Sequence, residues 1–161
     1  MRGTDIARYK SAGRDGVTAI IVNRGRLLVL KRRAIPFTMD PGEWEFVAGS
    51  RKRGESHADA AYREVLEETG IPKGRLTLAA KRARVVKTDA KGTFTYSNAL
   101  YVFCSGSDKV KLNIENSRHR WATYDEIAAH KDYTNVFLNE RLILGMIRKV
   151  LDAEAAEGKV G

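Results

Sequence analysis

Residues 49–71 have the sequence GSRKRGESHADAAYREVLEETGI, which contains the strongest helix signals of the chain. Within it, Ser56 can cap the start of a helix, and Asp59 three residues later supplies an acidic variant of the capping box. Gly70 accommodates the left-handed conformation in which many helices end. These signals predict a helix over residues 56–69.

Three glutamates of this helix stand at i, i+3 and i+4, so Glu64, Glu67 and Glu68 share one face. Their mutual repulsion leaves two interpretations, a solvated acidic face or a site for hard divalent cations, and Mg²⁺ prefers oxygen ligands of this kind. Arg63 can pair with Glu67 at i+4 and fix its rotamer, or it can form an ordinary surface ion pair worth less than about 1 kcal/mol. The chain is basic overall and its acidity is concentrated here, which favours the Mg²⁺ site.

The flanking segments predict an α/β sandwich with a mixed central sheet. Apolar runs bounded by turn-forming residues predict strands at residues 17–22, 27–33, 44–47, 76–87, 94–104 and 119–122. A capping box at residues 123–126 predicts a short helix, and helical spacing of apolar residues predicts a last helix that begins at Thr134.

The length of 161 residues predicts one domain, residues 15–152, with an N-terminal extension over residues 1–14 and a frayed tail over residues 153–161. Hydrophobic residues at 43% and charged residues at 30% exclude a wholly disordered chain. The single cysteine, Cys104, excludes an intrachain disulfide framework and a multi-cysteine zinc site.

A formal net charge of +9 favours polyanionic partners: nucleotides, nucleic acid or acidic membrane surfaces. We find no segment apolar enough to span a membrane and no secretory signal, so we expect a cytoplasmic protein without a membrane partner. The sequence leaves the oligomeric state open between a monomer and a homodimer.

The spacing of the defined residues resembles the Nudix box. Gly49 is followed after five residues by Glu55, and after seven more by REVLEETGI, residues 63–71. The resemblance implies a Nudix-type α/β/α sandwich and a Mg²⁺- or Mn²⁺-dependent hydrolase of a nucleoside diphosphate linked to another group. Two positions depart from the common pattern: Val-Ala-Gly at residues 47–49 replaces Pro-Gly-Gly, and Lys52 replaces an acidic residue.

The resemblance also implies roles for individual residues. The metal ligands that it implies are Gly49, through its carbonyl, Glu64, Glu67 and Glu68. Arg63 would orient a glutamate, and Glu55 would support the site or contact metal. Glu64 is either a ligand or the general base. Glu115 falls where the dATP and dihydroneopterin-triphosphate pyrophosphatases have a glutamate, and it is either an extra ligand, a base or a plain loop residue.

Candidate substrate-binding residues lie outside the helix. They are Arg32 at a strand end, Arg51 and Arg53 in the loop of the box, and Asn135 before the last helix, with a solvated basic edge and a flexible basic loop as the alternatives. Elimination of other subfamilies favours a nucleoside triphosphate or a related triphosphate, cleaved to the monophosphate and pyrophosphate. Hydrolysis of 5′-triphosphate or capped RNA, and a non-catalytic nucleotide-binding module, stay open as alternatives. The intact set of three repelling glutamates argues against the pure binder.

Overall fold

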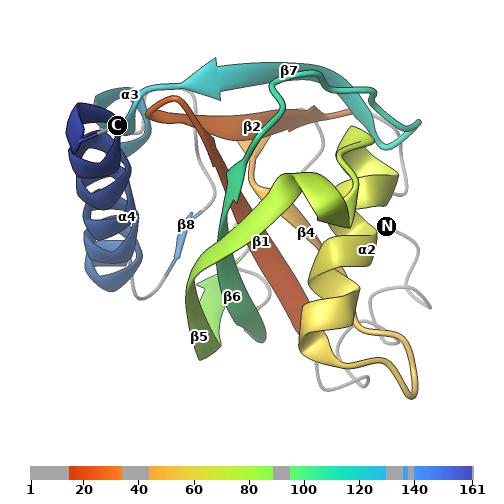
Figure 1. The fold of residues 1–161 in the computed structure, drawn as a ribbon. Helices are drawn as coiled ribbons and strands as arrows, with labels where there is room; N and C mark the ends of the chain where they lie inside the picture. Colours follow the sequence, from red (N-terminus) through yellow and green to blue (C-terminus); the bar gives the residue numbers. More distant parts are fainter. Residues whose placement is uncertain (1–14, 34–43, 89–94, 130–135, 138–139, 161) are drawn as a thin grey trace.

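The computed structural model describes residues 15–33, 44–88, 95–129, 136–137 and 140–160 (Figure 1). The strands are β1 (Gly16–Asn23), β2 (Arg26–Arg32), β3 (Trp44–Glu45), β4 (Val47–Ser50), β5 (Leu76–Thr88), β6 (Thr95–Ser105), β7 (Asn116–Ala122) and β8 (Val136–Phe137). The helices are α2 (His57–Thr69), α3 (Tyr124–Ala128) and α4 (Glu140–Val160), with a 3₁₀ turn η1 (Lys73–Arg75). None of the described helices is both long and apolar enough to cross a membrane.

Strand β1 organises the sheet. It runs parallel to β6, from Gly16 opposite Asn98 to Val22 opposite Cys104. Its other side pairs antiparallel with β4 at its start and with β2 at its end. Strands β5 and β8 continue the sheet beyond β6, and β3 and β7 pair with β2. The sheet therefore mixes parallel and antiparallel pairs, which confirms the predicted mixed sheet.

The two faces of the sheet carry separate cores. Because side chains alternate along a strand, Val17, Ala19 and Ile21 of β1 pack on the side of α2, whereas Ile20 and Val22 pack on the side of α4. Helices α2 and α4 lie on opposite sides of the sheet (Figure 1). The predicted α/β/α sandwich is confirmed.

Helix α2 has the ends that the sequence predicts. The Ser56 hydroxyl accepts a hydrogen bond from the Asp59 N–H at 3.0 Å. At the other end, Gly70 adopts φ +74° and its N–H donates to the Leu66 carbonyl at 2.9 Å. Both ends are fixed by local chemistry, so the glutamates between them keep their predicted helical spacing.

Some predicted boundaries were wrong. The last helix begins at Glu140 and not at Thr134, because residues 136–137 form β8 opposite Lys87 and Thr88 of β5. Helix α4 also continues through residues 153–160, which the composition assigned to a frayed tail. The strand predicted at 119–122 begins at residue 116, since the whole segment pairs with β2. The strand predicted at 44–47 is divided: β3 pairs with β2, and β4 pairs with β1.

Candidate active site

Arg63 connects the loop of the box to the glutamates of helix α2. Its Nε and Nη2 donate to the two carboxylate oxygens of Glu55 at 2.7 and 2.9 Å. Its Nη1 donates to Oε1 of Glu64 at 2.9 Å and to Oε2 of Glu67 at 3.2 Å, and Nη2 also reaches the Ser50 carbonyl at 2.9 Å. The predicted contact of Arg63 with Glu67 is present. The bidentate contact with Glu55 adds two charge-assisted hydrogen bonds that a simple surface ion pair with Glu67 would lack.

Glu55 closes the loop from its other end. Besides Arg63, its Oε1 accepts a hydrogen bond from the Lys52 N–H at 2.9 Å. The Arg63 hydrogen bonds, and then the Lys52 N–H, lower the pKa of Glu55 to about 2. Both carboxylate oxygens of Glu55 thus accept hydrogen bonds within the loop and from Arg63.

Glu64 lies against Gly49 at the end of β4. Glu64 is only 9% exposed. Burial raises the pKa of its carboxyl, although the hydrogen bond from Arg63 acts in the opposite direction. A Cβ at position 49 would collide with the carboxylate carbon and both oxygens of Glu64. The Glu64 carboxylate in this position therefore depends on the absence of a side chain at Gly49.

Glu68 is the most deeply buried of the three helix glutamates, with 4% exposure. Burial raises its pKa well above the usual value, the charges of Glu64 and Glu45 raise it further, and Arg32 partly opposes them. Its Oε2 accepts a hydrogen bond from the Ala48 N–H at 3.3 Å. Among the described residues, no cation forms an ion pair with Glu68.

The register of β4 decides which backbone groups face the glutamates. In an antiparallel pair, alternate residues direct their N–H and C=O toward the partner strand. The Arg51 N–H donates to the Asp15 carbonyl beside β1 at 3.0 Å. Gly49 lies two residues before Arg51 and opposite Val17 of β1, so its backbone groups have the same direction as those of Arg51. The backbone groups of Gly49 therefore point toward β1, and those of Ala48 point away from β1, where the Ala48 N–H meets Glu68.

Glu67 and Glu115 complete the acidic set. The side chain of Glu67 is 48% exposed, so it faces solvent at the rim. Glu115 is exposed in a turn that is tied to β2, since the Arg33 N–H donates to the Glu115 carbonyl at 2.8 Å. The charge of Glu115 contributes to the raised pKa of both Glu64 and Glu68. The fold therefore brings the Glu115 carboxylate toward helix α2, which is where an additional ligand or a base would have to lie.

Glu45 is a carboxylate of this site that the sequence did not single out. It is 7% exposed in the short strand β3, forms an ion pair with Arg32, and its charge raises the pKa of Glu68. Arg32 thus lies within electrostatic reach of the helix glutamates, although its Nε is held by Glu45. In the sequence Glu45 lies between Trp44 and Phe46, and this local context does not show that the carboxylate points inward.

The other substrate-binding candidates have different surroundings. Arg51 holds the loop: its Nε donates to Asp15 at 2.7 Å and its Nη1 donates to the Glu55 carbonyl at 2.8 Å. His57 also contacts Asp15, and Arg51 and then His57 lower the pKa of that carboxyl. Arg53 is exposed in the turn of the loop. Asn135 lies outside the described residues.

The donor set suits a hard divalent cation. Carboxylate and carbonyl oxygens are the ligands of Mg²⁺ and Mn²⁺. Glu64 and Glu68 supply two buried carboxyl groups, and Arg63 donates a hydrogen bond to Glu64. Within the described ranges, no three His, Cys, Asp or Glu side chains already converge as a metal site. The residues therefore fit such an ion if Glu67 or backbone carbonyls complete the coordination.

Comparison with known proteins agrees with this geometry. The family model of the NUDIX domain matches residues 13–139. Among solved structures, a MutT protein from Methanosarcina mazei Go1 is 23% identical, with 88% of this chain and 94% of that chain covered and a TM-score of 0.62. An Ap4A hydrolase of C. elegans is 21% identical, with 89% and 98% covered and a TM-score of 0.66.

A third solved structure has higher identity over a shorter region. The E. coli dihydroneopterin triphosphate pyrophosphohydrolase is 26% identical, with 71% of this chain and 84% of that chain covered and a TM-score of 0.58. The family model spans most of the chain, including all of the box and the strands that support it. The chain therefore belongs to the NUDIX family and is a Nudix hydrolase.

Proposed function

We propose that this protein hydrolyses a phosphoanhydride bond of a nucleoside triphosphate, or of a related nucleoside diphosphate derivative, with Mg²⁺ or Mn²⁺ as cofactor. The observation that carries the proposal is the burial of Glu68 at 4% exposure without an ion-pair partner among the described residues. An ionised carboxylate in such surroundings is costly unless a cation compensates it. A divalent cation would supply that compensation.

The side chains of Glu64, Glu67 and Glu68 would hold the metal. The register of β4 favours the carbonyl of Ala48 over that of Gly49 as the backbone ligand, since the backbone groups of Ala48 face the glutamates. When bound, the metal would offset the negative charge of the pyrophosphate and activate the phosphorus for attack. Gly49 would then serve by leaving room for the Glu64 carboxylate.

The chain's own residues would move the proton and hold the geometry. Glu64 or Glu115 would accept the proton of the attacking water, and burial, which raises the pKa of Glu64, makes its carboxylate a stronger base than an exposed one. Arg63 is a positioning residue: it holds Glu64 and Glu67 in place through Nη1 and is itself held by Glu55.

The choice of substrate is supported by the charge of the loop and by similarity to an enzyme of known substrate. The exposed Lys52 and Arg53 of the loop offer positive charge for the phosphates. The likeness to a dihydroneopterin triphosphate pyrophosphohydrolase, at 26% identity, supports a triphosphate substrate. We propose attack at the α phosphorus, which yields the monophosphate and pyrophosphate.

The test is release of pyrophosphate from a panel of nucleoside triphosphates and nucleoside diphosphate derivatives, with short 5′-triphosphate RNA included. We expect turnover with Mg²⁺ and its loss in excess EDTA. Glu67→Gln and Glu68→Gln should each lower turnover on the order of a hundredfold, as loss of an ionic ligand does. Asp59→Asn, an exposed acidic residue in the first turn of α2, is the matched control and should retain turnover. Turnover that persists in EDTA would contradict the proposal.

A further inference from the structure

Asp15, the residue before strand β1, contacts both ends of the loop of the box, residues 51–56. Its Oδ2 accepts a hydrogen bond from Nε of Arg51 at 2.7 Å, and its carbonyl accepts one from the Arg51 N–H at 3.0 Å. Its Oδ1 lies 2.5 Å from Nε2 of His57, the first residue of helix α2. One residue therefore joins the start of the loop to the start of the helix.

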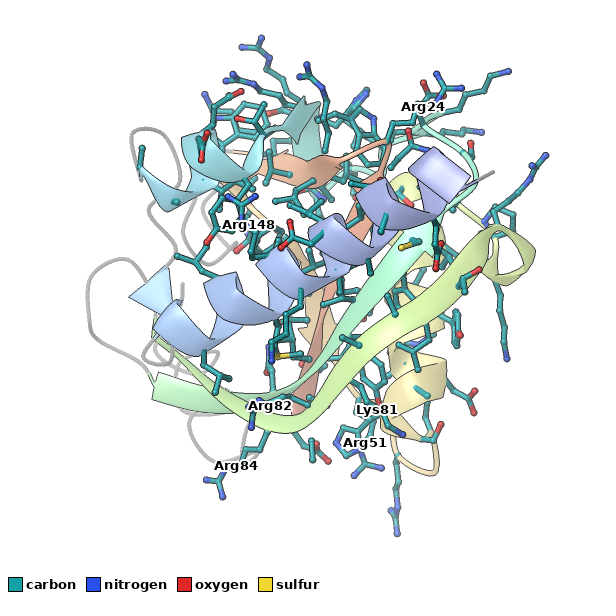
Figure 2. The ribbon with its side chains drawn as sticks, turned by 60° about the vertical axis from the view of Figure 1, so that its left-hand side comes forward. Arg24, Arg51, Lys81, Arg82, Arg84 and Arg148 are labelled. Atoms are coloured by element: carbon teal, nitrogen blue, oxygen red, sulfur yellow. The ribbon has the colours of Figure 1, made fainter. Side chains whose placement is uncertain are left out.

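The position of Asp15 is set by the sheet and not by the loop. The next residue, Gly16, lies opposite Ser50 of β4, and Val17 is fully buried beneath α2. Figure 2 shows Arg51 at the lower end of the molecule, where the loop joins α2 in Figure 1. The contacts of Asp15 thus attach the loop to the core of the protein.

Arg51 transmits this attachment to Glu55 at the other side of the loop. Its Nη1 donates to the Glu55 carbonyl at 2.8 Å. The carboxylate of Glu55 holds Arg63 through two hydrogen bonds, and Arg63 donates in turn to Glu64. A continuous series of hydrogen bonds therefore leads from Asp15 to a buried glutamate of the candidate active site.

We propose that Asp15 is a positioning residue, which acts through Arg51 on the loop that carries Glu55. Glu55 in turn determines the direction of the Arg63 guanidinium. Asp15 needs no contact with substrate or metal in this role. Its effect on the reaction rests on the proposed function, because that effect requires Glu64 to take part in hydrolysis.

The exposure of these side chains separates positioning from general stabilisation. The side chains of Asp15, Arg51 and His57 are 42%, 32% and 41% exposed. Ion pairs with this exposure contribute little to the stability of the whole fold. Small displacements of catalytic groups, in contrast, lower reaction rates strongly. Loss of the Asp15 carboxylate should therefore change the rate much more than the Tm.

Binding of a substrate phosphate is the competing role for Arg51. In that role, Asp15 would compete with the substrate for the guanidinium. Arg51→Gln would then raise KM, and Asp15→Ala would lower it. Positioning predicts instead that both variants lower kcat and leave KM unchanged.

The first measurement is steady-state hydrolysis by Asp15→Ala and by Arg51→Gln, with Tm recorded for each. We expect kcat to fall about tenfold in both, with KM unchanged and Tm lower by less than about 4 °C. Asp15→Ala keeps the backbone carbonyl that accepts the Arg51 N–H, so the edge of the sheet is preserved. A change of KM without a change of kcat would overturn the proposal.

The matched control removes a different ion pair of similar exposure. Arg120 of β7 pairs with Glu126 of α3, and these side chains are 47% and 34% exposed. Arg120→Gln should leave kcat and KM unchanged. An equal loss of kcat in Arg120→Gln and Asp15→Ala would show that any exposed ion pair has this effect, which contradicts a specific role for Asp15.

A double-mutant cycle tests the route through Glu55. In the Glu55→Gln background the bidentate contact with Arg63 is already lost, so a further change at Asp15 has little left to disturb. Asp15→Ala should then lower kcat by no more than about twofold, against about tenfold in the unmodified protein. The same tenfold loss in both backgrounds would overturn the proposed route.

Limited digestion with trypsin, in EDTA and without nucleotide, measures the loop itself. Lys52 and Arg53 are exposed cleavage sites within it, and Arg24, in the turn between β1 and β2, is the internal reference. Asp15→Ala should be cut at the loop about two- to fivefold faster, because the loop opens more often, with cleavage at Arg24 unchanged. Unchanged cleavage at the loop would overturn the proposal. If the unmodified protein hydrolysed no nucleotide, the proposed function would fail, and this digestion would still decide whether Asp15 holds the loop.

Discussion

Arg63 holds both carboxylate oxygens of Glu55, with Nε to Oε2 at 2.7 Å and Nη2 to Oε1 at 2.9 Å. Lysine has a single ammonium group and cannot reproduce this planar, bidentate contact while also reaching Glu64 and Glu67. We expect Arg63→Lys to lower kcat about a hundredfold, because the glutamates lose their positions. Steady-state kinetics at saturating Mg²⁺ checks this. Full activity in Arg63→Lys would mean that one positive charge is sufficient.

The Glu55–Arg63 pair also predicts how stability depends on pH. The pKa of Glu55 falls from 4.5 to about 2 in the folded protein, so the unfolded state binds more protons between these values. The contribution of Glu55 to the free energy of unfolding is complete above about pH 4.5 and is lost as the pH falls toward 2. Urea unfolding of the protein and of Glu55→Gln across this range should show a difference that shrinks with acidity. A constant difference would contradict the assignment.

The raised pKa of Glu68 predicts the opposite dependence of stability on pH. Burial raises its pKa above 4.5 in the folded state, so the folded protein binds more protons than the unfolded chain once the pH exceeds that value. The metal-free protein should lose stability as the pH rises through this interval, and Glu68→Gln should not. We expect the Tm of Glu68→Gln in EDTA to equal or exceed that of the unmodified protein at pH 7. An insoluble Glu68→Gln would mean that the carboxylate has a structural role instead.

Gly49→Ala tests the contact between β4 and Glu64. The added Cβ would meet the carboxylate at the end of a flexible side chain, so the side chain can move while the backbone stays. We expect a loss of activity of up to about a hundredfold with little change in Tm. Gly74→Ala, where a Cβ meets nothing within 4 Å, is the control and should leave both unchanged. A large fall in Tm for Gly49→Ala would show that the backbone cannot accommodate the change.

The choice of general base can be made by comparing Glu64→Gln with Glu115→Gln. The variant that lacks the base should lose kcat and keep its metal affinity, whereas the variant that lacks a ligand should lose metal affinity as well. Titration calorimetry with Mn²⁺ and steady-state kinetics supply the two measurements. Hydrolysis in ¹⁸O-water should place the label in the monophosphate. Label found only in pyrophosphate would mean attack at the β phosphorus.

Local signals were sufficient where local chemistry decides the structure. Helix α2 begins at Ser56 and ends at Gly70 because a side-chain cap and a left-handed glycine act within a few residues. The start of the last helix could not be found in this way. Residues 136–137 carry helical apolar spacing, but pairing with β5, which lies far away in the sequence, makes them a strand.

The same distinction applies to the candidate site. Sequence spacing indicates that Glu64, Glu67 and Glu68 share a helix face, and the contact of Arg63 with Glu67 follows from the same spacing. The contact of Arg63 with the adjacent Glu64 does not follow from it. The contact of Arg51 with Asp15 joins residues 36 positions apart, so no local pattern reveals that this cation is engaged. The inward direction of Glu45 likewise depends on which strand β3 pairs with.

Strand β1 imposes a constraint on length that follows from its position between the two cores. Its odd-numbered residues from 17 to 21 pack beneath α2, and its even-numbered residues from 20 to 22 pack beneath α4. Insertion or deletion of one residue within the strand would exchange these two sets of side chains between the layers. It would also put Thr18 where small apolar side chains meet α2. Viable length variation in this part of the chain should therefore occur in whole two-residue steps or outside the strand.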